Sequence, residues 1–148
     1  VFSLPELRSR YEITLENYCK TVNIEALTML DMVHREILPA IEKYISVIAS
    51  TALAKAQAVP GISCRYESAM VKRLTSLTEG ADTAAERLAA AVADYRAITD
   101  VTAAADSIRD SVIPAMDALR AVCDEAETIV GEEYWCFPTY EKLLFSVR

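Results

Sequence analysis

Glycine and proline are scarce in this sequence of 148 residues, which contains three glycines and five prolines. Few turn-forming residues leave room for only a few long elements, and a composition rich in Ala, Leu, Glu and Arg is typical of helices. Cations are also in deficit, because 15 Lys and Arg stand against 22 Asp and Glu, for a net charge of −7. Phosphate backbones and anionic lipids bind cationic surfaces. We therefore expect a single all-α domain that binds neither nucleic acid nor a membrane.

Signals for export and for a membrane anchor are missing as well. No apolar run approaches the roughly 18–20 residues of a transmembrane helix, and the first residues do not resemble a signal peptide. The sequence opens without a methionine, and we expect it to be a fragment of a longer chain. Its four cysteines are far apart and form no CxxC pair. Reduced thiols in a cytoplasmic protein are the simplest interpretation, with disulfides as the alternative.

Apolar residues recur at steps of three and four and predict three long helices, at about residues 4–58, 63–99 and 100–130. The stripe of the first helix comprises Leu7, Tyr11, Leu15, Tyr18, Val22, Ala26, Met29, Val33, Ile37, Ala40, Tyr44 and Val47. Ser3 followed by Glu6 predicts the start of this helix. Pro39 predicts a kink near residues 35–39, and Val59-Pro60-Gly61 predicts the end.

The second stripe keeps its register from Met70 to Tyr95, so we place Gly80 inside a helix; the alternative is a break at Gly80-Ala81-Asp82. In the third helix we expect Asp100 to cap the start, Pro114 to bend the helix and Gly131 to be its C-terminal glycine. Short links and a period near 3.5 predict an elongated antiparallel bundle.

The first helix is the longest of the three, at about 80 Å against roughly 50 Å for the others. We therefore expect its N-terminal part to overhang, to pair with another copy, or to break near Asn23. The final residues, 131–148, concentrate large apolar side chains and are expected to dock on the bundle or on a missing domain, since their exposure would favour association. A short last helix is expected to begin at Pro138. The large apolar side chains of residues 131–148 are Tyr134, Trp135, Phe137, Tyr140, Leu143, Leu144 and Phe145.

The sequence contains few residues that could support catalysis or bind a metal ion. His34 is the only histidine, and the residues after it lack the lysine and the small side chains of helical phosphotransfer domains. Asp31 and His34 form one acid–histidine pair, whereas a di-metal carboxylate bundle needs two such pairs and two further acids. Walker A and GxGxxG motifs are absent. We expect no catalytic, cofactor-binding or metal-binding residue.

Charged residues along the first helix have two interpretations, a solvated face or an interface with the rest of a longer protein. Glu16 and Lys20 stand four residues apart and are expected to form an ion pair.

Two segments, one at each end, carry motifs that go beyond periodicity. The first has Arg10-Tyr11-Glu12, then Tyr18 and Lys20, then Ile24-Glu25. The second has the pattern Trp-x-x-Pro-x-Tyr-x-x-Leu-Leu-Phe, formed by Trp135, Pro138, Tyr140, Leu143, Leu144 and Phe145. Together they resemble the C-terminal region of type III glutamine synthetases. The middle, about residues 45–120, is similar only in length and helical character.

This resemblance implies a parent enzyme that ligates ammonia to glutamate with ATP and magnesium or manganese, in the cytoplasm. It implies no catalytic residue in this chain. The implied role is structural or regulatory, with the parent's own catalytic domain and neighbouring subunits of a ring-shaped homo-oligomer as partners. The implied docking residues are Arg10, Tyr11, Glu12, Trp135, Phe137, Pro138, Tyr140, Leu144 and Phe145. The alternative is a stand-alone helical signalling or scaffolding module.

Overall fold

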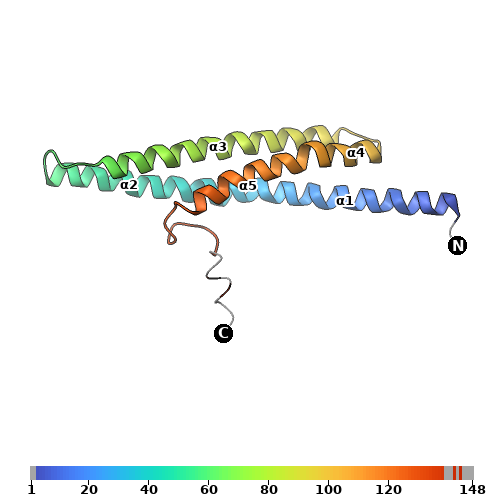
Figure 1. Cartoon of the computed structure of the whole chain (residues 1–148), viewed down its shortest axis with the longest axis horizontal. Coiled ribbons are helices and arrows are strands. Elements are labelled where there is room, and N and C mark those ends of the chain that lie inside the picture. The colour runs from blue at the N-terminus through green and yellow to red at the C-terminus, as the bar shows by residue number, and fades with distance from the viewer. Residues whose placement is uncertain (1–2, 139–141, 143, 145–148) are drawn as a thin grey trace. The chain divides into compact units, whose positions relative to one another are not determined.

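The computed structural model describes residues 3–138, 142 and 144, and the regular structure in this part of the chain is entirely helical (Figure 1). Its elements are α1 (Leu4–Met32), the π-helical turn η1 (Val33–Ile37), α2 (Leu38–Ala58), α3 (Arg65–Arg96), α4 (Val101–Ser107), the π-helical turn η2 (Ile108–Val112) and α5 (Ile113–Glu127). Because α1, η1 and α2 are contiguous, as are α4, η2 and α5, they form three helical stretches. The prediction of an all-α fold is confirmed. Their assembly into one antiparallel bundle with a docked tail stays a prediction.

Short polar residues set the helix starts, as the sequence predicted. Ser3 donates to the carboxylate of Glu6 from its backbone nitrogen at 2.7 Å and from its hydroxyl at 2.8 Å. Asp100 caps α4, since its carboxylate accepts from the backbone nitrogen of Ala103 at 2.8 Å. The bonds from the backbone nitrogens of Ser3 and Ala103 satisfy N–H groups that have no partner inside the helix. After α2 the chain turns at Gly61, whose φ of +81° favours glycine.

Pro39 and Pro114 each lie two residues beyond the end of a π turn, η1 and η2 respectively. Proline lacks the backbone N–H, and its ring crowds the carbonyl one turn earlier. A wider π turn accommodates both effects without ending the helix. The kink predicted near residues 35–39 and the disturbance predicted for Pro114 therefore take the form of π turns.

Two glycines behave differently from each other. Helix α3 runs through Gly80, so the alternative of a break at this position is wrong. The third stretch ends at Glu127 rather than near residue 130, and among the described residues only Gly61 has a positive φ. The prediction that Gly131 is the C-terminal glycine of the third helix is thus wrong. A side chain at Gly131 would instead lie 3.3 Å from both Tyr44 and Tyr134, so close approach explains the glycine.

The chain divides into two compact units, residues 1–31 with 83–120, and residues 32–82 with 121–148. The core of the first unit consists of Cys19, Val22, Ala26, Ala84, Ala85, Leu88, Val92, Ala104, Ile108, Val112 and Leu119. The core of the second consists of Val33, Ile37, Ala40, Ile41, Ile48, Leu74, Leu77, Ala81, Cys123, Ala126 and Val130. Most of these residues belong to the predicted stripes. The single-domain organisation stays a prediction.

One helical stretch meets the length and composition of a membrane span. Residues 4–58 contain an 18-residue window with a mean hydropathy of 1.4, of which 22% is buried. The expectation that no segment approaches such a span is therefore wrong by this criterion. The core helices of soluble proteins meet the same criterion, so the window alone does not indicate a membrane protein.

Candidate interaction surfaces

The N-terminal turns of α1 are bare within the first unit. Residues 3–14 are all exposed, whereas Cys19, Val22 and Ala26 on the same helix are buried. Helices α3 and α4, which cover α1 in this unit, end at the turn that joins them (Figure 1). There Arg96 Nε donates to Asn23 Oδ1 at 3.2 Å. Helix α1 continues past this point without interruption, so of the three alternatives the break near Asn23 is wrong, and the helix extends beyond its partners in this unit.

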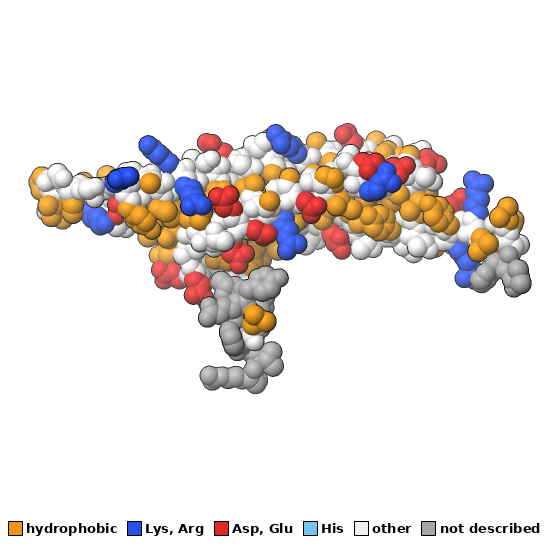
Figure 2. Space-filling model, viewed as in Figure 1, with side chains coloured by type: hydrophobic (Ala, Val, Ile, Leu, Met, Phe, Trp, Pro, Cys, Tyr) orange, Lys and Arg blue, Asp and Glu red, His pale blue; other side chains and the backbone are white. Residues whose placement is uncertain are grey.

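Apolar side chains are exposed on these bare turns, and Figure 2 shows some of them near the N-terminal end. The exposed fractions are 82% for Leu4, 50% for Leu7, 58% for Tyr11 and 43% for Tyr18, and Leu15 is half-buried. Steps of three and four residues continue this line into the buried residues farther along α1, so it is an extension of the core-forming face. We call residues Leu4, Leu7, Tyr11, Leu15 and Tyr18 the N-terminal stripe.

The first predicted docking motif lies on this segment. Tyr11 belongs to the N-terminal stripe, and its neighbours Arg10 and Glu12 are exposed on either side of it. Glu12 Oε1 accepts from Arg8 Nε at 3.1 Å. The expected pair of Glu16 and Lys20 is confirmed at 3.3 Å. Pairs this exposed contribute little to stability, so their charges are chiefly relevant to what could approach the stripe.

A cleft of about 320 Å³ lies where the α3–α4 turn meets α1. Two cations, Lys20 and Arg96, and one carboxylate, Glu16, stand among its lining residues. The remaining lining residues are Cys19, Asn23, Tyr95, Ile98, Thr99, Val101 and Ala104. The sequence analysis missed this cleft, because residues 20 and 96 are far apart in the chain and only the packing of α1 against α3 brings them together.

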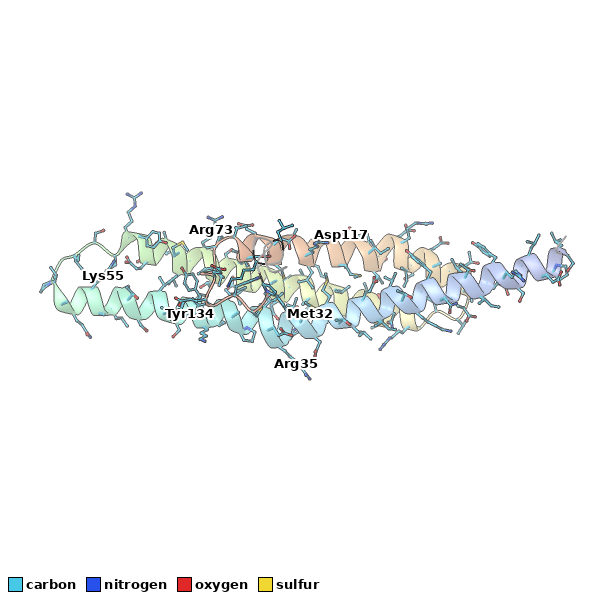
Figure 3. All side chains as sticks on the ribbon, turned by 90° about the horizontal axis from the view of Figure 1, so that it is seen from below. Met32, Arg35, Lys55, Arg73, Asp117 and Tyr134 are labelled. Atoms are coloured by element: carbon cyan, nitrogen blue, oxygen red, sulfur yellow. The ribbon has the colours of Figure 1, made fainter. Side chains whose placement is uncertain are left out.

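The chain after α5 returns to α2 in the second unit (Figure 3). The ring of Tyr134 lies 5.2 Å from the ring of Tyr44, at an interplanar angle of 36°. Lys43 Nζ lies 5.9 Å from the centre of the same Tyr134 ring. Aromatic and cation–π contacts of this kind favour a defined position for the segment.

The remaining docking candidates are less enclosed. Trp135 and Phe137 are half-buried, and Pro138 is exposed. Leu144 is 71% exposed, while Tyr140 and Phe145 lie outside the described residues, as do the residues directly after Pro138 where a last helix was expected. The structure therefore places the beginning of the aromatic segment against α2 and leaves the role of its end a prediction.

A buried carboxylate marks the loop between α2 and α3. The side chain of Glu67 is only 6% exposed and pairs with the Nζ atom of Lys55. The hydrogen bond from Lys55 holds the pKa of Glu67 below its ordinary value of 4.5. The same bond raises the pKa of Lys55 above 10.5. The sequence analysis did not find this pair, because residues 55 and 67 face each other only after the turn at Gly61.

Side chains that could bind a metal ion are scattered over the described part of the chain. Among the described residues no cluster of three His, Cys, Asp or Glu side chains could hold a metal ion. His34 is exposed on η1 and Asp31 is exposed on α1. The described cysteines are free, and burial raises the pKa of the Cys123 thiol to about 11, which makes it a poor nucleophile. The described residues therefore provide no cluster of side chains that could hold magnesium or manganese.

Comparison with known proteins agrees with the motifs at the two ends. Residues 1–56 match the family model of the glutamine synthetase C-terminal domain. A glutamine synthetase of Butyrivibrio fibrisolvens is 32% identical over 148 residues, which are 100% of this chain and 21% of the relative. A type-3 glutamine synthetase of Dictyostelium discoideum is 29% identical over 153 residues, covering 98% of this chain and 20% of the relative. The chain thus spans about a fifth of the length of these relatives. Its first 56 residues are similar to the glutamine synthetase C-terminal domain, and the whole chain is similar to the matched fifth of these two enzymes.

Proposed function

We propose that this chain is the non-catalytic C-terminal part of a glutamine synthetase, and that it braces the assembled enzyme. The observation that carries the proposal is the similarity to two glutamine synthetases along the whole chain, which occupies only a fifth of each relative. The rest of the protein would ligate ammonia to glutamate. There ATP would activate the glutamate carboxylate, and magnesium or manganese would offset the charge that develops.

The bracing role is supported by surface that the chain itself leaves uncovered. The N-terminal stripe continues a core-forming face, yet Leu4, Leu7, Tyr11 and Tyr18 are exposed, and contiguous apolar surface of this kind is typical of interfaces. The partners that we propose are the protein's own catalytic domain and neighbouring subunits of a cytoplasmic homo-oligomer. We further propose that the three helical stretches form one antiparallel bundle on which the aromatic segment docks.

Three proteins test this function: the 148-residue chain alone, the whole protein encoded by its reading frame, and that protein without these 148 residues. We expect glutamine formation from glutamate, ammonia, ATP and magnesium only with the whole protein. Removal of the 148 residues should lower the mass of the assembly measured by light scattering. Intact mass and activity after removal, or turnover by the chain alone, would overturn the proposal.

The rival function, a stand-alone helical scaffold, is distinguished by the same reading frame. A start codon directly beside Val1, with no catalytic region upstream, would favour the rival. A continuous upstream region similar to the remaining four-fifths of the relatives would favour the synthetase.

A further inference from the structure

The N-terminal stripe reads almost the same in both directions. Its members are separated by three, four, four and three residues, so the pattern is symmetric about Tyr11. At about 100° per residue, the five side chains fall within an arc of about 80° whose middle is Tyr11. A second copy that runs antiparallel would therefore present the same pattern at the same heights.

We propose that the N-terminal stripe pairs with the N-terminal stripe of a second copy of this chain, antiparallel, with Tyr11 at the twofold axis. Leu7 of one copy then lies level with Leu15 of the other, and Leu4 lies level with Tyr18. The isologous contact closes on itself, as twofold interfaces do. The inference names the segment of the neighbouring subunit that is engaged, and in this respect it rests on the proposed role in assembly.

Charge complementarity favours this partner. Arg8 and Glu12 lie on one flank of the stripe, where their ion pair of 3.1 Å shows that they share a side of the helix. In an antiparallel pair the same flanks of the two helices meet. Along the seam, Arg8 of the first copy is followed by Glu12 of the second copy, and Glu12 of the first copy is followed by Arg8 of the second copy. Opposite charges are neighbours at each end of this row. The two Glu12 side chains are neighbours at the centre of the row, so the two Arg8–Glu12 contacts between copies must outweigh this repulsion. Arg10 lies on the other flank at the same angle from Tyr11 as Glu12, about 100°, and its two copies are neighbours there.

The size of the contact sets its strength. The stripe spans 15 residues, or about 22 Å of helix. It is shorter than a standard interface, which uses roughly 20–30 residues from each partner. We therefore expect a weak pair that forms at high concentration in the 148-residue chain and gains from other contacts in an assembled protein.

Charge reversal in trans tests the pairing. Arg8→Glu gives a chain whose flank is wholly acidic, and Glu12→Arg gives one whose flank is wholly basic. By analytical ultracentrifugation the original chain should approach twice 16.3 kDa as its concentration rises. Each variant alone should remain at monomer mass, and an equal mixture should restore the dimer. Repair of an ion pair within one helix cannot produce recovery by mixing, because each chain in the mixture still lacks its own pair.

Ser9, which lies on the far face of α1, supplies the matched control. Ser9→Glu and Ser9→Arg change the charge equally but should leave the dimer unchanged. Cysteine cross-linking in a chain whose four native cysteines are replaced by serine reports the direction. A mixture of Leu4→Cys and Tyr18→Cys chains should yield the mixed disulfide, and a Ser9→Cys chain should yield none. Circular dichroism of each variant verifies that helix content is retained.

A chain that stays monomeric at every concentration, or variants that fail to recover on mixing, would overturn the pairing. So would preferential Leu4→Cys homodimers, which indicate parallel helices. Even if the pairing fails, the assembly can still lose mass when the 148 residues are deleted from the whole protein. That result would support the proposed function, with the catalytic domain and not a second copy as the partner of the stripe. The failure of one proposal is therefore distinguishable from the failure of the other.

Discussion

The rings of Tyr44 and Tyr134 lie 5.2 Å apart at an angle of 36°, and this contact ties the segment after α5 to α2. Gly131 makes the contact feasible, because any side chain there would approach both rings at 3.3 Å. The second unit therefore depends on a small group of residues that are distant in sequence. Replacing either ring should loosen the segment without unfolding the helices.

Tyr44→Ala is expected to lower the free energy of unfolding by about 1–2 kcal/mol, since it removes half-buried aromatic surface and the ring contact. Denaturation in urea measures the loss. Tyr66→Ala is the matched control, because Tyr66 is 66% exposed and should change stability little. A double-mutant cycle with Tyr134→Ala isolates the ring contact, and a coupling energy of zero would contradict it.

Gly80 and Gly131 should respond in opposite directions to alanine. A methyl group at Gly80 would lie 3.6 Å from Cγ1 of Val122, an ordinary van der Waals distance, and Gly80 is inside α3. Gly80→Ala should thus stabilise the protein by up to about 1 kcal/mol. Gly131→Ala should lower the melting temperature, because the tyrosine rings around it must move. Thermal denaturation of the two variants side by side tests both signs, and equal shifts would contradict the explanation.

Much of the helical architecture can be predicted from local sequence. A period near 3.5 is a property of each helix alone, so the stripes predict buried residues such as Val22, Val33 and Ile37 without knowledge of their partners. Ser3 and Asp100 act through bonds within three residues of themselves, and their caps were predictable for the same reason.

The interaction surfaces could be predicted only in part. Tyr11 is recognisable as part of a stripe, but its exposure depends on where α3 and α4 end beside α1. The cleft beside Arg96 depends on packing between distant segments. Gly131 shows the same limit, because the sequence suggests a helix end and the actual constraint is the approach of Tyr44 from another helix.

The π turn η1 should behave as one extra residue in an otherwise α-helical stretch. Deleting Glu36, which is exposed, together with Pro39→Ala should therefore give a continuous α-helix and keep Ile41 and Ile48 in the core. We expect the melting temperature to change by only a few degrees. Deleting the exposed Glu42 instead is the matched control, since it rotates Ile48 by about 100° relative to Ile41. Equal destabilisation by both deletions would contradict this account.

The pair of Lys55 and Glu67 predicts a specific dependence of stability on pH. Because Lys55 lowers the pKa of Glu67 from 4.5, the pair's contribution from this carboxylate is fully present above pH 4.5 and is lost as the pH falls through the lowered value. Glu67 raises the pKa of Lys55 above 10.5, so the contribution from the ammonium is present below pH 10.5 and is lost as the pH rises through the raised value. The stability difference between the original chain and Glu67→Gln should thus be largest between these limits.

Urea denaturation at a series of pH values measures this difference. Glu125→Gln is the control: Glu125 pairs with Arg73 at 3.2 Å, but its side chain is 52% exposed, so its removal should have little effect. Lys55→Met should destabilise the protein more than Glu67→Gln does near neutral pH, because it leaves a buried carboxylate without its cation. If Lys55→Met is instead the milder change, the carboxylate must reach solvent without Lys55, and the pair cannot be what holds α2 and α3 together beside the turn.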